Sequence, residues 1–252
     1  MTMRILAAIG FGCLAFAADQ STQNESKQIA QVSKTERMDF PAGGTLRLEH
    51  SIGVLTVEAW DRPDVEITTI KSTKAELDAR GRERAGSQLE KVHVATERSG
   101  NELVVTTTFP RHLAFPSSFP SKGEVSFLLE VRIKAPVAAR IIDEHHDVGE
   151  VNIDGLTSDI QVSLHQGAIT LHLPEEGQYS IHAKSTFGSV HSDFSEHEKR
   201  RWWVLGHQSL SETTTAPHKL DLKVAFGDIV LLKTRVPKAP GSLLTVRQTG
   251  GL

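Results

Sequence analysis

The densest group of side chains that could bind a metal or transfer a proton is the run Asp143-Glu144-His145-His146-Asp147, and nine of the twelve histidines lie between His145 and His218. A metal site needs three or four such ligands at one point. Successive side chains of a strand point to opposite faces, so a regular strand with Glu144 and His146 inward leaves His145 and Asp147 outward. We interpret the histidines as surface residues, keep His145 and Asp147 as the metal-ligand candidates, and predict no cofactor.

Aromatic side chains beside cations form a second group with chemical potential. Arg201, Trp202 and Trp203 are adjacent, and such a cluster can stack on a sugar ring or lie at a membrane interface. The structural alternative is that one tryptophan covers the end of the core while the other is partly exposed. Arg201, Trp202 and Trp203 are our ligand-binding candidates. Trp60, which precedes a turn, is expected to cover the core.

No motif in the sequence predicts a catalytic site. Gly-x-Ser-x-Gly, His-Glu-x-x-His and a phosphate-binding loop are absent. A glycan-processing enzyme would need two carboxylates about 5 to 9.5 Å apart, and outward Asp143, Glu150 or Asp159 on neighbouring strands could come that close. A carbohydrate-active lyase or hydrolase is therefore the alternative to a non-enzymatic protein.

The elements that would position these residues are marked by a repeat with a glycine at its centre. Five segments align on Gly53, Gly149, Gly167, Gly188 and Gly227. Positions seven, five, three and one before the glycine, and two and four after it, are apolar in 24 of 30 cases. The interleaved positions are apolar in only four of 25 cases. This contrast predicts two short strands that meet at a glycine corner, with inward residues alternating with outward ones.

Spacing between the glycines indicates how the units assemble. Gly149, Gly167 and Gly188 are 18 and 21 residues apart, and Gly227 follows 39 residues later; Gly206 could mark a unit between the last two. Units of about 20 residues that bury one face must stack on their neighbours. The sequence predicts an all-β fold, a short β-solenoid-like stack of glycine-cornered strands, with a two-sheet β-sandwich as the alternative.

Outside the repeat the sequence predicts further strands and one helix. Alternating runs indicate strands at 66–69, 91–96, 102–108 and 124–134. Residues 74–91 are the helical candidate, and 111–122 resemble a proline-containing loop. We expect a polar leader at 18–38 and a repetitive domain at 39–233, which could divide into an irregular part at 39–135 and regular repeats at 136–233. A tail with prolines would occupy 234–252.

The first residues predict export. Arg4 precedes an uncharged apolar stretch that ends in Ala15-Phe16-Ala17, which is typical of a signal peptide over residues 1–17. Cys13 is the only cysteine, and the apolar residues that continue past it argue against a lipid anchor there. The mature chain should have no membrane span. A formal net charge of −3 gives no electrostatic case for nucleic acid.

Several segments resemble a known bacterial family. Gly53-Val-Leu-Thr-Val57, Asp147-Val-Gly-Glu-Val-Asn-Ile-Asp-Gly155 and Ala225-Phe-Gly-Asp-Ile-Val-Leu231 look like the putative adhesin family, the domain of unknown function numbered 4097. The resemblance covers roughly 40–233. It implies an exported, repetitive β domain and brings no catalytic residues with it.

Taken together, the sequence predicts an adhesin-like, non-enzymatic binding or structural module of the cell envelope, periplasmic or at the cell surface. Its partner would be an envelope glycan or another envelope protein. The carbohydrate-active enzyme is the main alternative, and an envelope-stress or assembly factor is a third.

Expression in a bacterial host with a working secretion pathway is expected to yield a mature chain that begins at Ala18, because the small residues before it suit the signal peptidase. Intact mass and N-terminal sequencing of the exported fraction measure this. A chain that retains Met1 and stays in the cytosolic fraction would contradict it.

Overall fold

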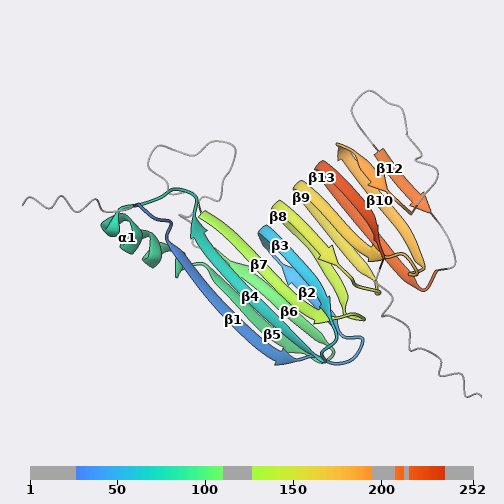
Figure 1. Ribbon diagram of the computed structural model, residues 1–252, viewed down its shortest axis with the longest axis horizontal. Helices are drawn as coiled ribbons and strands as arrows, with labels where there is room; N and C mark the ends of the chain where they lie inside the picture. Colours follow the sequence, from blue (N-terminus) through green and yellow to red (C-terminus); the bar gives the residue numbers. More distant parts are fainter. Residues whose placement is uncertain (1–26, 110–126, 195–207, 213–215, 236–252) are drawn as a thin grey trace, which may run out of the picture.

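Thirteen strands and one helix make up the described part of the chain. The computed structural model describes residues 27–109, 127–194, 208–212 and 216–235, with the backbone alone for 208–212. The strands are β1 (Gln31–Asp39), β2 (Thr45–Glu49), β3 (Ser51–Trp60), β4 (Asp64–Thr73), β5 (His93–Ser99), β6 (Glu102–Thr108), β7 (Phe127–Pro136), β8 (Arg140–Asp154), β9 (Ile160–Pro174), β10 (Tyr179–Phe187), β11 (Val190–Ser192), β12 (Gln208–Glu212) and β13 (His218–Thr234); the helix is α1 (Ala79–Leu89). The strands form one curled, open sheet (Figure 1).

Five parallel units at the centre of this sheet each carry a glycine near their middle. The units are β2–β3, β8, β9, β13 and β10–β11, adjacent in that order. Strand pairing places Gly53 beside Gly149, Gly149 beside Gly167 and Gly167 beside Gly227, and Gly188 lies against Gly227. We call these five residues the glycine column. The alignment of these glycines, inferred from the sequence, is confirmed.

Neighbouring backbones in the glycine column approach too closely for any side chain. A Cβ added to Gly167 would lie 1.7 Å from the carbonyl oxygen of Gly149, and one added to Gly149 would lie 1.7 Å from that of Gly53. Gly167 also has a φ of 139°, which residues with a Cβ rarely adopt. Four of the glycines are therefore required by the carbonyl of another column glycine, and Gly53 is required by that of Leu129 in β7.

The glycine column divides the sheet into two arms that share β8, β9 and β13. Before the glycines, strand order is β5-β6-β2-β8-β9-β13-β10-β12. After them it is β1-β4-β7-β3-β8-β9-β13-β11. The fold thus combines features of both predicted alternatives. The parallel stacking of the units is typical of a β-solenoid, and the two apolar layers are typical of a β-sandwich.

One hydrophobic core fills the space between the arms. Ile160 from the first arm and Ile169, Val190 and Ile229 from the second are all less than 5% exposed and belong to the same cluster. The prediction that the units bury their alternating side chains in a common interior is confirmed. A smaller cluster joins Ala85 and Leu89 of α1 to Ala30 and Phe127.

The order of the units in space differs from their order in the sequence. β13 lies between β9 and β10, although β10 precedes it in the chain. β12 pairs with β10 in the antiparallel direction, so the residues that follow Gly206 do not form another parallel unit. Gly206 itself lies outside the described residues.

Two expectations about the flanking segments are revised. Residues 31–38, placed in a flexible leader, belong to β1 and pair with β4 along its length. The expected helix at 74–91 is confirmed as the shorter α1. It begins after Asp78, whose carboxylate accepts a hydrogen bond of 2.6 Å from the Gly81 amide, a standard N-cap. Within the ranges described, no helix is long and apolar enough to cross a bilayer.

Replacement of Gly167 by alanine should lower the free energy of unfolding by about 3 kcal/mol or more, because the new Cβ collides with a backbone carbonyl and the backbone is strained. Gly86→Ala is a matched control. No atom lies within 4 Å of a Cβ at Gly86 in α1, so this change should stabilise by about 0.5–1 kcal/mol. Urea denaturation measures both, and equal stability of the two variants would refute the steric role of the column.

Candidate functional site

A buried aspartate and histidine lie directly before the corner in β8. Asp143 is fully buried and His146 is 2% exposed. His146 Nδ1 lies 3.0 Å from Asp143 Oδ2, and Nε2 lies 3.1 Å from the carbonyl oxygen of Gly53. A carbonyl only accepts, so Nε2 must donate, and one proton must lie between Nδ1 and the carboxylate. The pair thereby links β8 to Gly53, the column glycine of β3.

The buried pair coincides with a β-bulge that reverses part of the predicted register. Asp143 pairs with Val162 and His146 with Leu164, so three steps on β8 face two on β9. Asp143 therefore turns into the core, whereas Glu144 is exposed, which is the opposite of the sequence expectation. His146 is inward as expected.

His145 is exposed, as expected, and forms one end of a groove that crosses four strands. This corner groove has a volume of about 430 Å³. Its lining includes His145, Asp147, Ser163, His165, Lys184 and Lys223, from β8, β9, β10 and β13. Strand register places Lys184 beside Lys223 and Lys223 beside Ser163. The groove thus presents imidazole, ammonium, hydroxyl and carboxylate groups together.

Charges around the groove are partly paired within the protein. Lys223 Nζ lies 3.1 Å from Asp221 Oδ2. Glu144 accepts a hydrogen bond of 3.0 Å from Gln161 and lies 3.7 Å from Arg47. Four charged side chains line the groove: the cations Lys184 and Lys223 and the anions Glu144 and Asp147. Because the charges balance, the groove has no strong electrostatic potential of either sign.

An exposed aromatic pair borders the corner groove. Phe187 and Phe226 each precede their column glycine and remain 41% and 46% exposed. Their rings are stacked, with centroids 4.9 Å apart and planes 7° apart, and His165 meets Phe226 edge-on at 5.6 Å. The sequence pattern had placed the residue before each glycine inward. In the structure the residue before each glycine is half-buried or exposed, and burial resumes two residues after the glycine.

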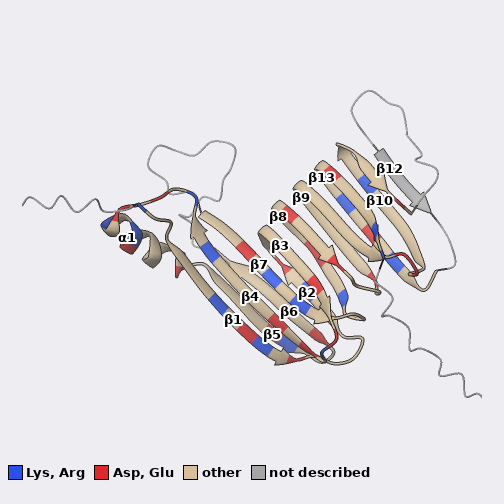
Figure 2. Ribbon diagram, viewed as in Figure 1, with Lys and Arg blue, Asp and Glu red and all other residues tan. Residues whose placement is uncertain are grey.

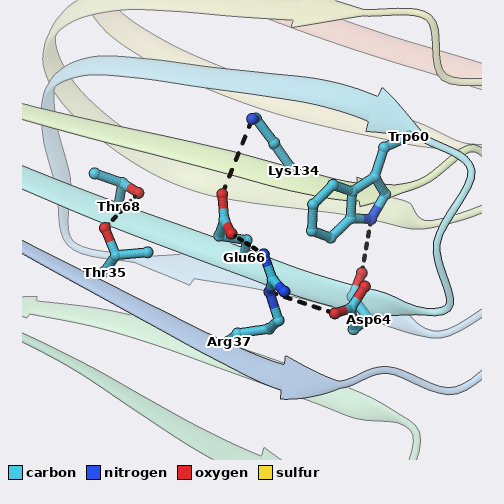
Figure 3. A network of polar contacts seen from close by, with 7 residues as sticks. All are labelled: Thr35, Arg37, Trp60, Asp64, Glu66, Thr68 and Lys134. Carbon is cyan, nitrogen blue, oxygen red and sulfur yellow. Dashed lines mark hydrogen bonds and ion pairs between the residues drawn. The ribbon is translucent and has the colours of Figure 1, made fainter.

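A second polar surface lies on the outer face of the other arm (Figure 3). Arg37 of β1 bonds to Glu66 of β4 and lies 3.5 Å from Asp64, and Lys134 of β7 lies 3.9 Å from Glu66. The hydrogen bond from Arg37 lowers the pKa of the Glu66 carboxyl. Lys and Arg alternate with Asp and Glu across β1, β4 and β7 (Figure 2). Because these charged groups pair with one another, this surface has fewer groups available to bind a ligand than the corner groove has.

Trp60 belongs to this outer surface rather than to the core. Its indole Nε1 donates to the Asp64 carbonyl at 2.8 Å, and the guanidinium carbons of Arg37 and Arg62 lie 5.7 and 5.3 Å from its ring centroid. The turn position is as expected, but the expectation that Trp60 covers the core is wrong.

The other sequence candidates have mixed outcomes. Arg201, Trp202 and Trp203 lie outside the described residues. Among the residues that the structure describes, no three or more His, Cys, Asp or Glu side chains gather as a metal site. Since Asp143 is buried, it cannot join Glu150 or Asp159 in an outward carboxylate pair.

Sequence reasoning missed one role, that of polar residues three positions before the glycine. His146 and Ser185 occupy this position in two units. His146 donates to the Gly53 carbonyl, and Ser185 Oγ donates to the Gly227 carbonyl at 2.8 Å. The available signal was that three of the five residues at this otherwise inward position are polar.

Comparison with known proteins yields structural neighbours only. No family model matches the chain, so the resemblance to domain 4097 is not confirmed, and no curated protein matches. A putative cell adhesion protein from Clostridium sporogenes is 14% identical with a TM-score of 0.43, covering 81% of this chain and all of that one. A putative adhesin from Bacteroides fragilis is 10% identical with a TM-score of 0.28, covering 82% and 99%. A putative lipid binding protein from Parabacteroides distasonis is 9% identical with a TM-score of 0.22, covering 81% and 97%.

The contribution of the buried pair to stability can be tested by replacing each member with the residue that lies beside it in β9, Val162 for Asp143 and Leu164 for His146. His146→Leu alone should cost about 3–5 kcal/mol, because it leaves the Asp143 carboxylate buried without a partner. Asp143→Val alone should cost about 1–3 kcal/mol, since only Nδ1 of the ring loses its partner. The double variant should be more stable than His146→Leu.

Urea denaturation of the four proteins measures this coupling. Strictly additive losses would show that the two side chains do not act as a pair.

Proposed function

We propose that this chain is an exported, non-enzymatic, adhesin-like binding module of the cell envelope, with a solenoid-like stack as its scaffold and the corner groove as its binding site. The observation that carries the proposal is the groove itself. It combines polar side chains from four strands with an exposed aromatic pair on its border.

The scaffold supports binding because it holds the groove residues in fixed positions. His145, Ser163, Lys184 and Lys223 project from hydrogen-bonded parallel strands whose backbones meet at the glycine column. A site built on strands loses little conformational entropy when a ligand binds. The exported location rests on the predicted signal peptide.

Binding is favoured over catalysis because two carboxylates near the groove interact with other side chains of the protein. Asp143 is buried against His146. Glu144 is held by Gln161 and faces Arg47. These two groups serve the fold, whereas hydrolysis of a glycan would require a pair of carboxylates available to the substrate.

Cosedimentation of the mature chain, residues 18–252, with purified envelopes of the source cell tests the proposal. Wild-type protein should bind saturably, and His165→Ala/Lys184→Ala should weaken binding at least about tenfold, since two groove contacts worth about 1 kcal/mol each are lost. Arg132→Ala/Lys134→Ala, on the outer face of β7, is the matched control and should bind as wild type does.

Absence of binding to any envelope fraction would refute the proposed function. Equal loss in both variants would remove the corner groove as its site. Release of new reducing ends from envelope polysaccharide by the wild-type chain would support the enzymatic alternative instead.

A further inference from the structure

We propose that the ligand of the corner groove is a linear glycan without net charge, whose sugar rings contact Phe187 and Phe226 while their hydroxyl groups bind the groove side chains. This inference rests on the proposed function and specifies the chemical class of its ligand. Three features of the groove carry it: the exposed ring pair, the balance of charge and the direction in which the groove runs.

The aromatic pair provides apolar contact that the fold does not use. Both rings lie on the outer face, more than 40% exposed, and stack on each other rather than on the core. On the β10 side, the described pairing of β12 ends at Ser185, two residues before Phe187. A pyranose ring presents a C–H face that packs on such an aromatic surface.

Charge and hydrogen-bonding capacity favour hydroxyl groups over an ionic ligand. Lys184 and Lys223 are balanced in the groove by Glu144 and Asp147. A polyanion would be repelled by the two carboxylates, and a polycation by the two ammonium groups. A sugar hydroxyl both donates and accepts, so it can bind a lysine, a histidine or a carboxylate in turn.

The groove has the length and direction that a linear chain needs. Its lining passes from β8 across β9 and β13 to β10. Three intervals between neighbouring strands span roughly 14 Å, enough for about three sugar rings. A ligand lying across the strands would meet a new set of polar side chains on each strand and would end at the Phe226 and Phe187 rings.

Binding of defined hexasaccharides tests the ligand class. Cellohexaose and maltohexaose, whose glucose units keep a 2,3-diol, serve as neutral linear probes, and a hexagalacturonate serves as the anionic probe. Saturation-transfer NMR should show magnetisation reaching the C–H protons of at least one neutral probe. Titration calorimetry should give a weaker or undetectable interaction with the anionic probe.

Two variants separate ring contact from folding. Phe187→Leu/Phe226→Leu keeps apolar side chains on the sheet but removes the rings, and Phe187→Ala/Phe226→Ala removes both. Each should reduce affinity for the neutral probe at least tenfold with an unchanged circular dichroism spectrum. Leu128→Ala, which alters a side chain of similar exposure (41%) on β7, should have no effect. Unchanged affinity in the leucine variant, or stronger binding of the anionic probe, would overturn the inference.

Chemical treatment of envelopes distinguishes failure of this inference from failure of the proposed function. Periodate cleaves vicinal diols of sugars, whereas protease removes protein partners. Cosedimentation should be lost after periodate and kept after protease. The reverse result would overturn the glycan and leave an envelope-binding module intact, whereas no cosedimentation with untreated envelopes would remove both.

Discussion

Contact between backbones in the glycine column is the constraint on which the rest of the molecule depends. Because four of the five glycines approach the carbonyl of another column glycine, five strand segments turn at the same level and their apolar halves face one interior. The column also supplies acceptors, since His146 and Ser185 donate to the carbonyls of Gly53 and Gly227. Phe187 and Phe226 stand directly before their column glycines, and at this corner they lie outside the core. The groove and its aromatic border are therefore direct consequences of the column.

The outer faces of the two arms differ in how far their polar groups are satisfied. On β1, β4 and β7, cations and anions alternate and pair across strands (Figure 2). Exposed pairs of this kind contribute little to stability, but they leave few groups in need of a partner. The corner groove combines paired groups such as Glu144 with His145, Lys184 and an exposed ring pair. A ligand therefore has more side chains to contact in the corner groove than on the outer face of β1, β4 and β7.

Much of the fold could be predicted from the sequence because a periodic apolar pattern reports burial directly. The positions two and four after each glycine are inward as predicted, except that Ser192 is only half-buried. The strand predicted at 102–108 is β6, and the helix predicted within 74–91 is the shorter α1 at Ala79–Leu89. These signals are local, and burial alone decides them.

The candidate site was less predictable because it depends on departures from the pattern. A one-residue bulge places Asp143 in the core, where the sequence pattern had placed Glu144. The residue types in this segment do not indicate where the bulge lies. The outward turn of Phe187 and Phe226 required knowledge of the corner geometry, since an apolar residue at an alternating position normally indicates the core. The order of the units was also hidden, because sequential stacking was the simplest interpretation of even spacing.

The position of β13 bears on how the chain acquires its structure. β9 and β10 are made before β13 and do not pair with each other, and the strand that joins them spans residues 218–234. During synthesis, the edges of β9 and β10 that will face β13 stay unpaired until β13 has emerged. Unpaired edges invite association with other chains, and contacts this distant in sequence form slowly. The molecule must therefore close from its C-terminal end, and a factor that shields those edges in the interval would raise the yield of folded protein.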